Sequence, residues 1–486
     1  MKRSFMKKSV LIITALFLII GLIFGQNFSA FAEEDLPADD NLTTEEDVGF
    51  TEAEAEEVEH ITFSSEMLAA AKDRFGLNRR MQLFNALPSP ADSGKILESA
   101  SLPYTGNAKV IAFHVTFQDQ KFEDGDTEDA LQKAIGVDTA GNTYAPLFNN
   151  QYGSLSGYYQ RASYGKLSIA GDTYVYEAQK AKGEYEDSTE LCRELLGAMD
   201  TKIDFSKYDA NADGLIDCLY LHIPYDSSDE WSSTWWPNCG NLIDEENMTY
   251  DGVHAASRII LSRQINTDDG VRTLIHESGH AMGFPDYYSF NKTPDPAGGA
   301  NQLTGTLTFD MMDTNVGDHN GFSKWIAGWL TNADVTLVNA NENGVVATRD
   351  GKAVGTVNED GSVTLDLESF DTDEISKTGG IIVVGNNVQH AFGNYFLIQY
   401  DTFAGNQKVY YGNDKQLPSG FRVYRVQAEL DEYGQLKRNN NYFPLYDKLI
   451  ELVDPDYKAE HTIPNGAYIP TGFAAETYSC MFYGGS

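Results

Sequence analysis

Basic residues are scarce in this chain of 486 residues. Lys and Arg together number 35, against 72 Asp and Glu, and the formal net charge is -37. So acidic a protein repels phosphate backbones, and nucleic acids are therefore excluded as expected partners. Hydrophobic residues still make up 42% of the chain, which argues against a wholly disordered protein, and the length predicts more than one domain.

Cysteine is also scarce, since the chain contains only Cys192, Cys218, Cys239 and Cys480. No two of them have the C-x-x-C spacing, so a zinc site built from thiolates is not expected. The four could form two disulfides, one or none. Buried free thiols are the plainer interpretation, and the sequence does not choose between these outcomes.

Long apolar runs are missing except at the N-terminus, where residues 10–24 follow four basic residues and precede Ala30-Phe31-Ala32. This order is typical of a secretory signal peptide and predicts cleavage between Ala32 and Glu33. The alternative is an uncleaved anchor, for which the run is slightly short. We therefore expect a signal peptide over residues 1–32, a secreted, extracellular protein, and no stable membrane association once the signal is removed.

The rest of the chain divides by composition. Residues 33–60 hold thirteen acidic residues and no Lys or Arg, which predicts a disordered acidic leader. This leader, a propeptide or a solvated spacer, extends over residues 33–106 and includes a short helix predicted over Ser65–Phe75. A folded domain over residues 107–330 and a β-rich C-terminal region over residues 331–486 follow, and the expected class is α+β.

Several elements of these two parts are predicted individually. Runs rich in Val, Ile and Phe predict strands, and one amphipathic stretch predicts a helix. Asp-Gly pairs between short apolar runs predict hairpin turns. The strands are expected at residues 109–117, 218–223 and 259–265, the helix at 188–199, and the turns at Asp350-Gly351 and Asp360-Gly361.

The most informative stretch is VRTLIHESGHAMGFPDYYSF, residues 271–290. Its apolar positions predict a helix, on which His276 and His280 lie four residues apart and point to the same side. Two imidazoles so placed suit a tetrahedral zinc ion. Glu277 lies beside them, where its carboxylate can act as a base on a zinc-bound water without binding the metal itself.

Zinc needs a third protein ligand, and Asp286 is the first choice. Gly283 can adopt a positive φ and end the helix, and Pro285 prevents the helix from resuming, so the chain turns back towards the metal. No Glu occurs between Glu277 and Glu342, which disfavours a Glu ligand from a later helix. Three other residues remain as alternatives: Asp310, Asp313 and His319.

At this point a family resemblance becomes specific. HESGHAMGFPDYY resembles the His-Glu-x-x-His-x-x-Gly-x-Pro-Asp signature of the M6 family of secreted bacterial metalloproteases, the immune-inhibitor-A-like peptidases. The resemblance is looser outside this motif, where it covers about residues 109–426. Similar stretches are GSLSGYYQRASYGKL (153–167), FDMMD (309–313), FSKWIAGW (322–329), residues 395–400 and LPSGFRVYRV (417–426).

The resemblance implies a metzincin-like zinc metallopeptidase domain that binds peptide along an edge strand, with Met312 as the methionine of the Met-turn. It also implies peptide-bond hydrolysis, in which Glu277 accepts the water proton and passes it to the leaving amine. Tyr287 and Tyr288 are candidates for stabilising the oxyanion. Phe284 and Tyr287 depart from the residues expected near the metal, so specificity is open.

A second ion is predicted in the loop DANADGLID, residues 209–217. Oxygen-bearing side chains alternate around Gly214, which permits a tight turn, and such ligands suit calcium. The alternative is an Asx-rich turn without metal. The four candidate ligands are Asp209, Asn211, Asp213 and Asp217.

The leading hypothesis is thus a secreted zinc-dependent endopeptidase that acts on extracellular proteins or peptides, with Zn²⁺ as cofactor and Ca²⁺ as a structural ion. The alternative is a catalytically silent surface or carbohydrate-binding protein on a metalloprotease-like scaffold. Trp231, Trp235 and Trp236 could line a substrate cleft or stack on a sugar, or simply pack over the core. Retention of Glu277 favours the enzyme, because a binding protein has no need of a base.

Overall fold

A computed structural model describes residues 59–63 and 101–452, with internal gaps. The signal peptide, most of the leader, the helix predicted at Ser65–Phe75, Trp231 and Cys480 lie outside the described residues. No helix in the described part is long and apolar enough to span a membrane. The gaps are residues 148–149, 230–233, 243–244, 246, 289–309, 342–343, 372–379, 387, 412–414, 417–418, 431–435, 439 and 441–447.

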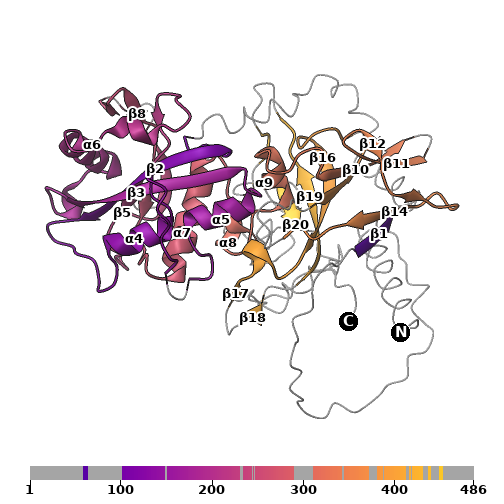
Figure 1. Cartoon of the computed structure of the whole chain (residues 1–486), viewed down its shortest axis with the longest axis horizontal. Helices are drawn as coiled ribbons and strands as arrows, with labels where there is room; N and C mark the ends of the chain where they lie inside the picture. The colour runs from indigo at the N-terminus through magenta and orange to yellow at the C-terminus, as the bar shows by residue number, and fades with distance from the viewer. Residues whose placement is uncertain are drawn as a thin grey trace, which may run out of the picture.

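The first unit is built on a five-stranded sheet with the order β3-β2-β5-β9-β6. The first four strands are parallel, and β6 pairs antiparallel with β9 at the edge. Figure 1 shows this sheet with its helices at the left of the molecule. The strands are β2 (Gly106–Thr116), β3 (Leu167–Glu177), β5 (Cys218–His222), β6 (Asn238–Asn241) and β9 (Ser257–Leu261).

Helices cover both faces of this sheet, as expected for mainly parallel strands. Alternate side chains of β2 enter two different clusters: Val110 packs with Leu131 and Leu274 on one face, and Phe113 packs with Leu195 on the other. The first face therefore carries α4 (Glu128–Ile135), α5 (Leu155–Ala162) and α7 (Asp268–Ala281), and the second carries α6 (Ser188–Met199).

Smaller elements complete the first unit. A three-stranded sheet has the order β4-β8-β7, and two short helices follow the gap at residues 289–309. These helices lead into the second unit. The elements are η3 (Lys182–Glu184), η4 (Phe205–Tyr208), β4 (Leu215–Ile216), β7 (Thr249–Tyr250), β8 (Val253–Ala255), α8 (Met311–Thr314) and α9 (Gly321–Ile326).

The second unit is built on a seven-stranded sheet with the order β12-β11-β10-β15-β16-β19-β20. Only β10 and β15 pair parallel, and the other neighbours are antiparallel. The strands are β10 (Val335–Asn341), β11 (Gly344–Arg349), β12 (Lys352–Ala353), β15 (Ile381–Gly385), β16 (Asn394–Asp401), β19 (Gly420–Gln427) and β20 (Ile450–Leu452).

Two small sheets accompany it, of which one has the order β1-β14-β13 and the other pairs β17 with β18. The β-rich character predicted for this region is confirmed for the described residues, which contain η5 (Gly405–Gln407) as their one helical turn after α9. The small-sheet strands are β1 (Glu59–Phe63), β13 (Thr356–Val357), β14 (Val363–Leu367), β17 (Tyr410–Tyr411) and β18 (Lys415–Gln416).

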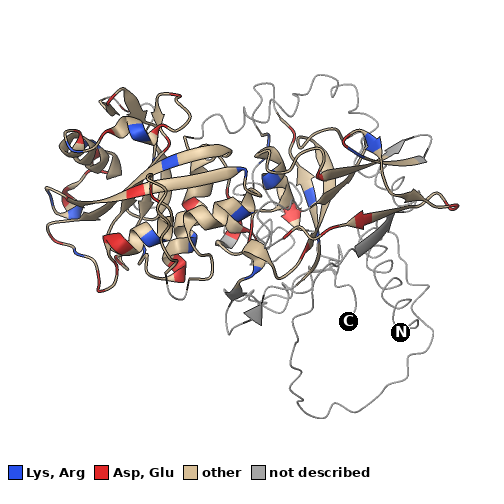
Figure 2. Cartoon of the chain, viewed as in Figure 1, with Lys and Arg blue, Asp and Glu red and all other residues tan. Residues whose placement is uncertain are grey.

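The two units share a hydrophobic core. On one face of the seven-stranded sheet, Ile382 and Ile398 pack with Leu365 of β14. On the opposite face, Leu397 belongs to the same cluster as Trp329 and the core of the first unit. Helix α9 lies at this joint (Figure 1), and acidic and basic residues are distributed over both units (Figure 2).

Most predicted elements are confirmed. Helix α6 has the predicted bounds, and β2, β5 and β9 begin and end within four residues of the predicted ends. Asp350 and Gly351 both have positive φ at the turn between β11 and β12, as a tight hairpin requires. The segment with Asp360-Gly361 joins the antiparallel strands β13 and β14.

The expected mixture of helices and sheets is confirmed, and in the first unit the helices alternate with parallel strands. One expectation needs correction. The leader was expected to be disordered through residue 60, yet Glu59 and His60 belong to β1, which pairs antiparallel with β14. Backbone pairing with a partner 300 residues away overrides local composition there.

Candidate metal centre

The helix that carries the histidines has well-defined ends. At its start, the Thr267 side chain accepts a hydrogen bond from the backbone N–H of Gly270, and two acidic residues occupy the first turn. At its end, Gly283 has a φ of 92°, as predicted. The backbone N–H of Phe284 returns to the carbonyl of Gly279, so the chain reverses and carries Asp286 back towards the helix.

His276, His280 and Asp286 converge. The Oδ1 atom of Asp286 lies 3.2 Å from Nε2 of His276 and 3.1 Å from Nε2 of His280. Zinc bonds of 2.0–2.2 Å at tetrahedral angles place neighbouring ligand atoms about 3.3–3.6 Å apart. Within the described part of the chain, this is the only group of three His, Cys, Asp or Glu residues whose ligand atoms approach this closely.

The backbone sets the protonation of both rings. Nδ1 of His276 lies 2.7 Å from the carbonyl oxygen of Met311, and Nδ1 of His280 lies 2.8 Å from that of Phe284. A carbonyl only accepts, so each Nδ1 must donate, which leaves Nε2 of each ring free to bind a cation when the ring is neutral. Oδ1 of Asp286 faces these two Nε2 atoms. A cation satisfies this arrangement.

The pKa shifts of His280 and Asp286 also indicate that a positive charge is stabilised at this place. Burial alone would lower the pKa of His280, but the charge of Asp286 and its hydrogen bond raise that pKa from 6.5 to about 9. Burial would raise the pKa of Asp286, yet the two histidines hold it well below its usual range. Either a proton or a metal ion must balance the carboxylate.

The centre is open on one side. The His276 side chain is 6% exposed and that of Asp286 is 12% exposed, whereas that of His280 is 23% exposed. A closed structural zinc site has four protein ligands, while a catalytic site has three and leaves one position accessible. The three ligands and the exposure on the His280 side match the second kind.

Glu277 lies beside the sheet edge and is buried. Burial raises the pKa of its carboxyl group, the two histidines lower it, and Asp286 raises it further. The carboxylate also accepts a hydrogen bond from the backbone N–H of Cys239 on the edge strand β6. A carboxyl with a raised pKa next to the metal ligands is suited to taking up and releasing a proton.

Helix α8 contacts both segments that carry the candidate ligands. Its Met311 carbonyl orients His276, and the next carbonyl, that of Met312, accepts a hydrogen bond from the backbone N–H of Tyr287, 2.8 Å away. The Met312 side chain packs against Gly279, where an added Cβ would lie 2.5 Å from its sulfur. The structure thus places Met312 directly against the metal helix.

The three alternative ligands lie elsewhere. Asp310 uses its carboxylate to bind the N–H of Met312 and both the N–H and the side-chain amide of Asn320. His319 is fully buried among aromatic rings, and neither of its ring nitrogens has a hydrogen-bond partner. Neither these two residues nor Asp313 belongs to the converging group.

The two tyrosines proposed for the oxyanion differ. The Tyr287 side chain is fully buried, and its hydroxyl makes a hydrogen bond of 2.6 Å with that of Ser323 on α9. A role of either tyrosine at the oxyanion stays a prediction. Tyr288 contacts Asp286 through a hydrogen bond, and burial together with Asp286 raises the pKa of its hydroxyl.

The predicted calcium loop forms a tight turn. Asp209 accepts hydrogen bonds from the N–H groups of Asp213 and Gly214, with Ala212 and Gly214 at positive φ. Asp217 instead accepts a bond of 2.6 Å from the N–H of Lys109 on β2, and burial raises its pKa to about 7. Among the described residues, Asp209, Asp213 and Asp217 do not form a group with converging ligand atoms like that of His276, His280 and Asp286. The calcium site stays a prediction.

The described part of the chain includes three of the four cysteines and two of the tryptophans considered for a substrate cleft. Cys192 and Cys218 are buried free thiols, and Cys239 is a half-buried one. Trp235 packs edge-on against Phe117 at 5.5 Å, and the guanidinium of Arg263 covers Trp236 at 4.5 Å. Trp235 thus packs over the core, and the substrate-cleft and sugar-stacking alternatives stay open.

The residues that sequence analysis missed act through the backbone. They are the carbonyl groups of Met311 and Phe284 and the N–H of Cys239, and no side-chain pattern marks such groups. Comparison of the chain with models of known protein families finds no match, and comparison with curated proteins finds none either.

Proposed function

We propose that the protein is a secreted zinc-dependent endopeptidase. The observation that carries the proposal is the convergence of His276, His280 and Asp286 on one point, with Glu277 beside it. Both imidazoles are held as Nε2 ligands by backbone carbonyls. An ion-binding site without catalytic function would not require a buried carboxylic acid next to its ligands.

The sheet topology supports a metzincin-like domain. A mainly parallel sheet ends in the antiparallel edge strand β6, and the helix with the histidines follows the neighbouring strand β9. β6 is half-buried to exposed. An extended peptide can pair with such an edge through its backbone, which recognises many sequences alike. This arrangement favours a polypeptide substrate over a small molecule.

The chain's own residues then divide the work. His276, His280 and Asp286 would hold a zinc ion, which would supply Lewis-acid chemistry at the scissile carbonyl and the attacking water. Glu277 accepts the proton of the attacking water and delivers it to the leaving amine. Cys239 orients the Glu277 carboxylate through its backbone N–H. For the loop at residues 209–217 we propose a structural Ca²⁺ ion.

The test replaces the base and leaves the ligands intact. Glu277→Gln should bind one zinc ion per chain as the wild type does, while hydrolysis of casein falls by about 1000-fold, within the range for loss of a general base. Glu128→Gln, a change at an exposed position on α4, is the control and should retain full activity. Zinc is measured by metal analysis of protein purified without chelators.

Three results would contradict the proposal. They are full hydrolysis by Glu277→Gln, hydrolysis that persists after complete metal removal, or wild-type protein that contains no zinc and cleaves nothing. The last result would favour the silent binding protein.

A further inference from the structure

The residues around α8 link the metal centre to the rest of the molecule. The consecutive carbonyls of Met311 and Met312 hold His276 and the backbone of Tyr287, the residue after Asp286. Both ligand-bearing segments, α7 and the turn with Asp286, therefore make a hydrogen bond to this short helix. Any residue that fixes residues 310–320 acts on the metal ligands through these two hydrogen bonds.

Hydrogen bonds join the two ends of the segment 310–320. The Asp310 carboxylate accepts hydrogen bonds of 2.7 Å each from the N–H of Met312 and from the N–H and side-chain amide of Asn320. The N–H of Met311 donates to the carbonyl of Asp318 at 3.3 Å. The position of α8 thus depends on where Asp318 and Asn320 are held.

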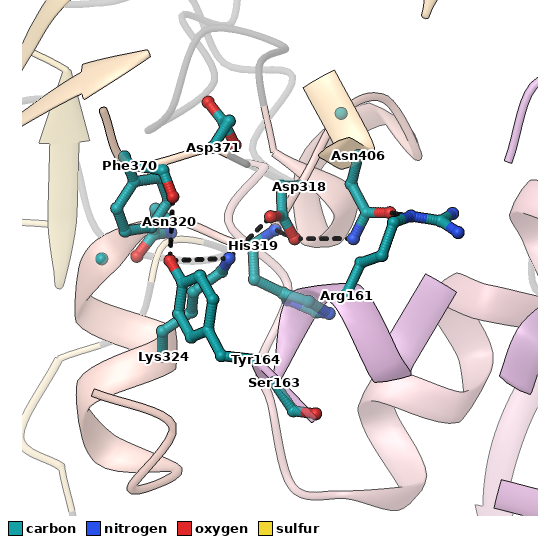
Figure 3. A network of polar contacts seen from close by, with 12 residues as sticks. Arg161, Ser163, Tyr164, Asp318, His319, Asn320, Lys324, Phe370, Asp371 and Asn406 are labelled. Carbon is teal, nitrogen blue, oxygen red and sulfur yellow. Dashed lines mark hydrogen bonds and ion pairs between the residues drawn. The ribbon is translucent and has the colours of Figure 1, made fainter. Parts of the chain in front are cut away.

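Asp318 is held by residues outside the loop (Figure 3). Its Oδ2 atom lies 2.6 Å from Nζ of Lys324, and both side chains are almost completely buried. Its Oδ1 atom accepts a hydrogen bond of 3.2 Å from the side-chain amide of Asn406. Lys324 is itself enclosed by the rings of Tyr164 and Phe370, at 4.4 and 4.5 Å from the ring centroids.

Asn406 comes from η5 in the second unit and is buried. Besides Asp318, it contacts α5 of the first unit twice. Its amide nitrogen donates to the carbonyl of Tyr158 at 3.1 Å, and its Oδ1 accepts from Nε of Arg161 at 2.8 Å. One amide group from the second unit therefore joins α5 to the loop that carries α8 (Figure 3).

We propose that Asn406 is a positioning residue of the metal centre, through the contacts Asn406–Asp318, Asp318–Met311 and Met311–His276. The second unit then takes part in zinc binding, although none of its residues touches the metal. This inference rests on the proposed zinc site. It differs from a general stabilising role because it predicts an effect on the metal ligands that exceeds the effect on folding.

Removal of a direct hydrogen-bond partner of a metal ligand costs about 10- to 100-fold in metal affinity. Asn406 acts two contacts further out, so Asn406→Ala should weaken zinc binding by about 10-fold, the lower end of that range. Asn406→Ser retains a small polar group and should show a smaller loss in the same direction. It also serves if the alanine variant folds poorly.

Asn339→Ala provides the matched control. Asn339 on β10 makes two hydrogen bonds with the backbone of Val388, at 2.9 and 3.3 Å, within the second unit alone. The full-length variants are compared by the zinc dissociation constant from competition with a chelator, and by the thermal midpoint. The visible absorption spectrum of the Co²⁺-substituted protein reports ligand geometry independently of activity.

The expected result is weaker zinc binding and an altered Co²⁺ spectrum for the Asn406 variants, with neither change in Asn339→Ala at a comparable thermal midpoint. The inference is overturned if the Asn406 variants match Asn339→Ala in zinc affinity and spectrum. It is equally overturned if zinc affinity falls only in proportion to thermal stability in all variants. If the wild type itself binds no zinc, the proposed function fails first, and the two failures are thus distinguishable.

Discussion

The five-stranded and the seven-stranded sheets differ in what they contribute to the metal centre. The candidate ligands and the candidate base all lie in the first unit, where α7 is the next helix after β9 and Glu277 contacts the edge strand β6. The second sheet provides no ligand, but Gln399 and Asn406 from its unit contact the segment between Gly317 and Gly321. The candidate ligands and the base thus lie within one short motif, whereas the residues that hold the supporting segment in place come from distant parts of the chain.

This difference explains why local sequence patterns indicate the candidate ligands but not the residues that support them. Ligands on one helix must keep a fixed spacing, since 3.6 residues per turn aligns His276 with His280. A residue that supports the ligands needs only to place a hydrogen-bonding group correctly in space, and residues from many positions in the sequence can do so. The continuous buried runs of β15 and β16 are typical of a sheet covered on both faces, but they do not indicate which residue of this unit supports the candidate metal centre.

The largest effect that would sharpen this comparison is expected at a ligand. Asp286→Ala should weaken zinc binding by more than about 100-fold, beyond what loss of an indirect partner costs. Glu359→Ala, an exposed change in the second unit, is the control and should bind zinc normally. The dissociation constant is measured by chelator competition, and unchanged affinity in Asp286→Ala would place the third ligand elsewhere.

An intermediate effect is expected from two glycines in close contact, one in each unit. A Cβ at Gly279 would lie 2.5 Å from the Met312 sulfur, and a Cβ at Gly385 would lie 2.5 Å from Val388. Overpacking costs about 1–3 kcal/mol, so Gly279→Ala and Gly385→Ala should both lower the free energy of unfolding in urea. Only Gly279→Ala should also weaken zinc binding. Equal zinc affinity in both variants would break the comparison.

The smallest effect concerns His319, whose ring nitrogens are buried without partners. A phenylalanine fits the same aromatic surroundings, so His319→Phe should raise the free energy of unfolding by about 1 kcal/mol at pH 7 and leave zinc binding unchanged. A loss of zinc in this variant would contradict the assignment of Asp286 as third ligand.

The advantage of His319→Phe should depend on pH. Burial lowers the pKa of His319 from 6.5 to about 3; Asp318 opposes this shift, and Lys324 and His276 add to it. Below pH 6.5 the unfolded chain binds a proton that the folded protein does not, so the wild type loses stability as the pH falls from 6.5 towards 3. The stability difference between variant and wild type should therefore grow over this interval, as urea titrations at several pH values can measure.

Much of the candidate site follows from local rules. The spacing of His276 and His280, the helix end at Gly283 and the return of the chain to Asp286 all depend on neighbours within ten residues. The bounds of α6 follow from a capping aspartate and an amphipathic pattern. These features need no knowledge of the rest of the fold.

Other features depend on contacts between distant segments. Tyr287, a candidate for the oxyanion, packs against Ser323, because α9 provides a buried hydroxyl at that place. Asp217 was expected to face a calcium ion, and it also binds the backbone of β2, more than 100 residues earlier in the chain. The contact of β1 with β14 is of the same kind.

The amino-acid sequence alone determined the identity and spacing of the groups that face the candidate metal position, since helix geometry converts spacing directly into direction. Tertiary structure alone decided which backbone carbonyls orient the two imidazoles and which carboxylates accept hydrogen bonds from other groups. It also decided that Asn406 joins the two units. The physical reason is that a hydrogen bond depends on distance in space, and distance between remote segments is set only when the hydrophobic core brings them together.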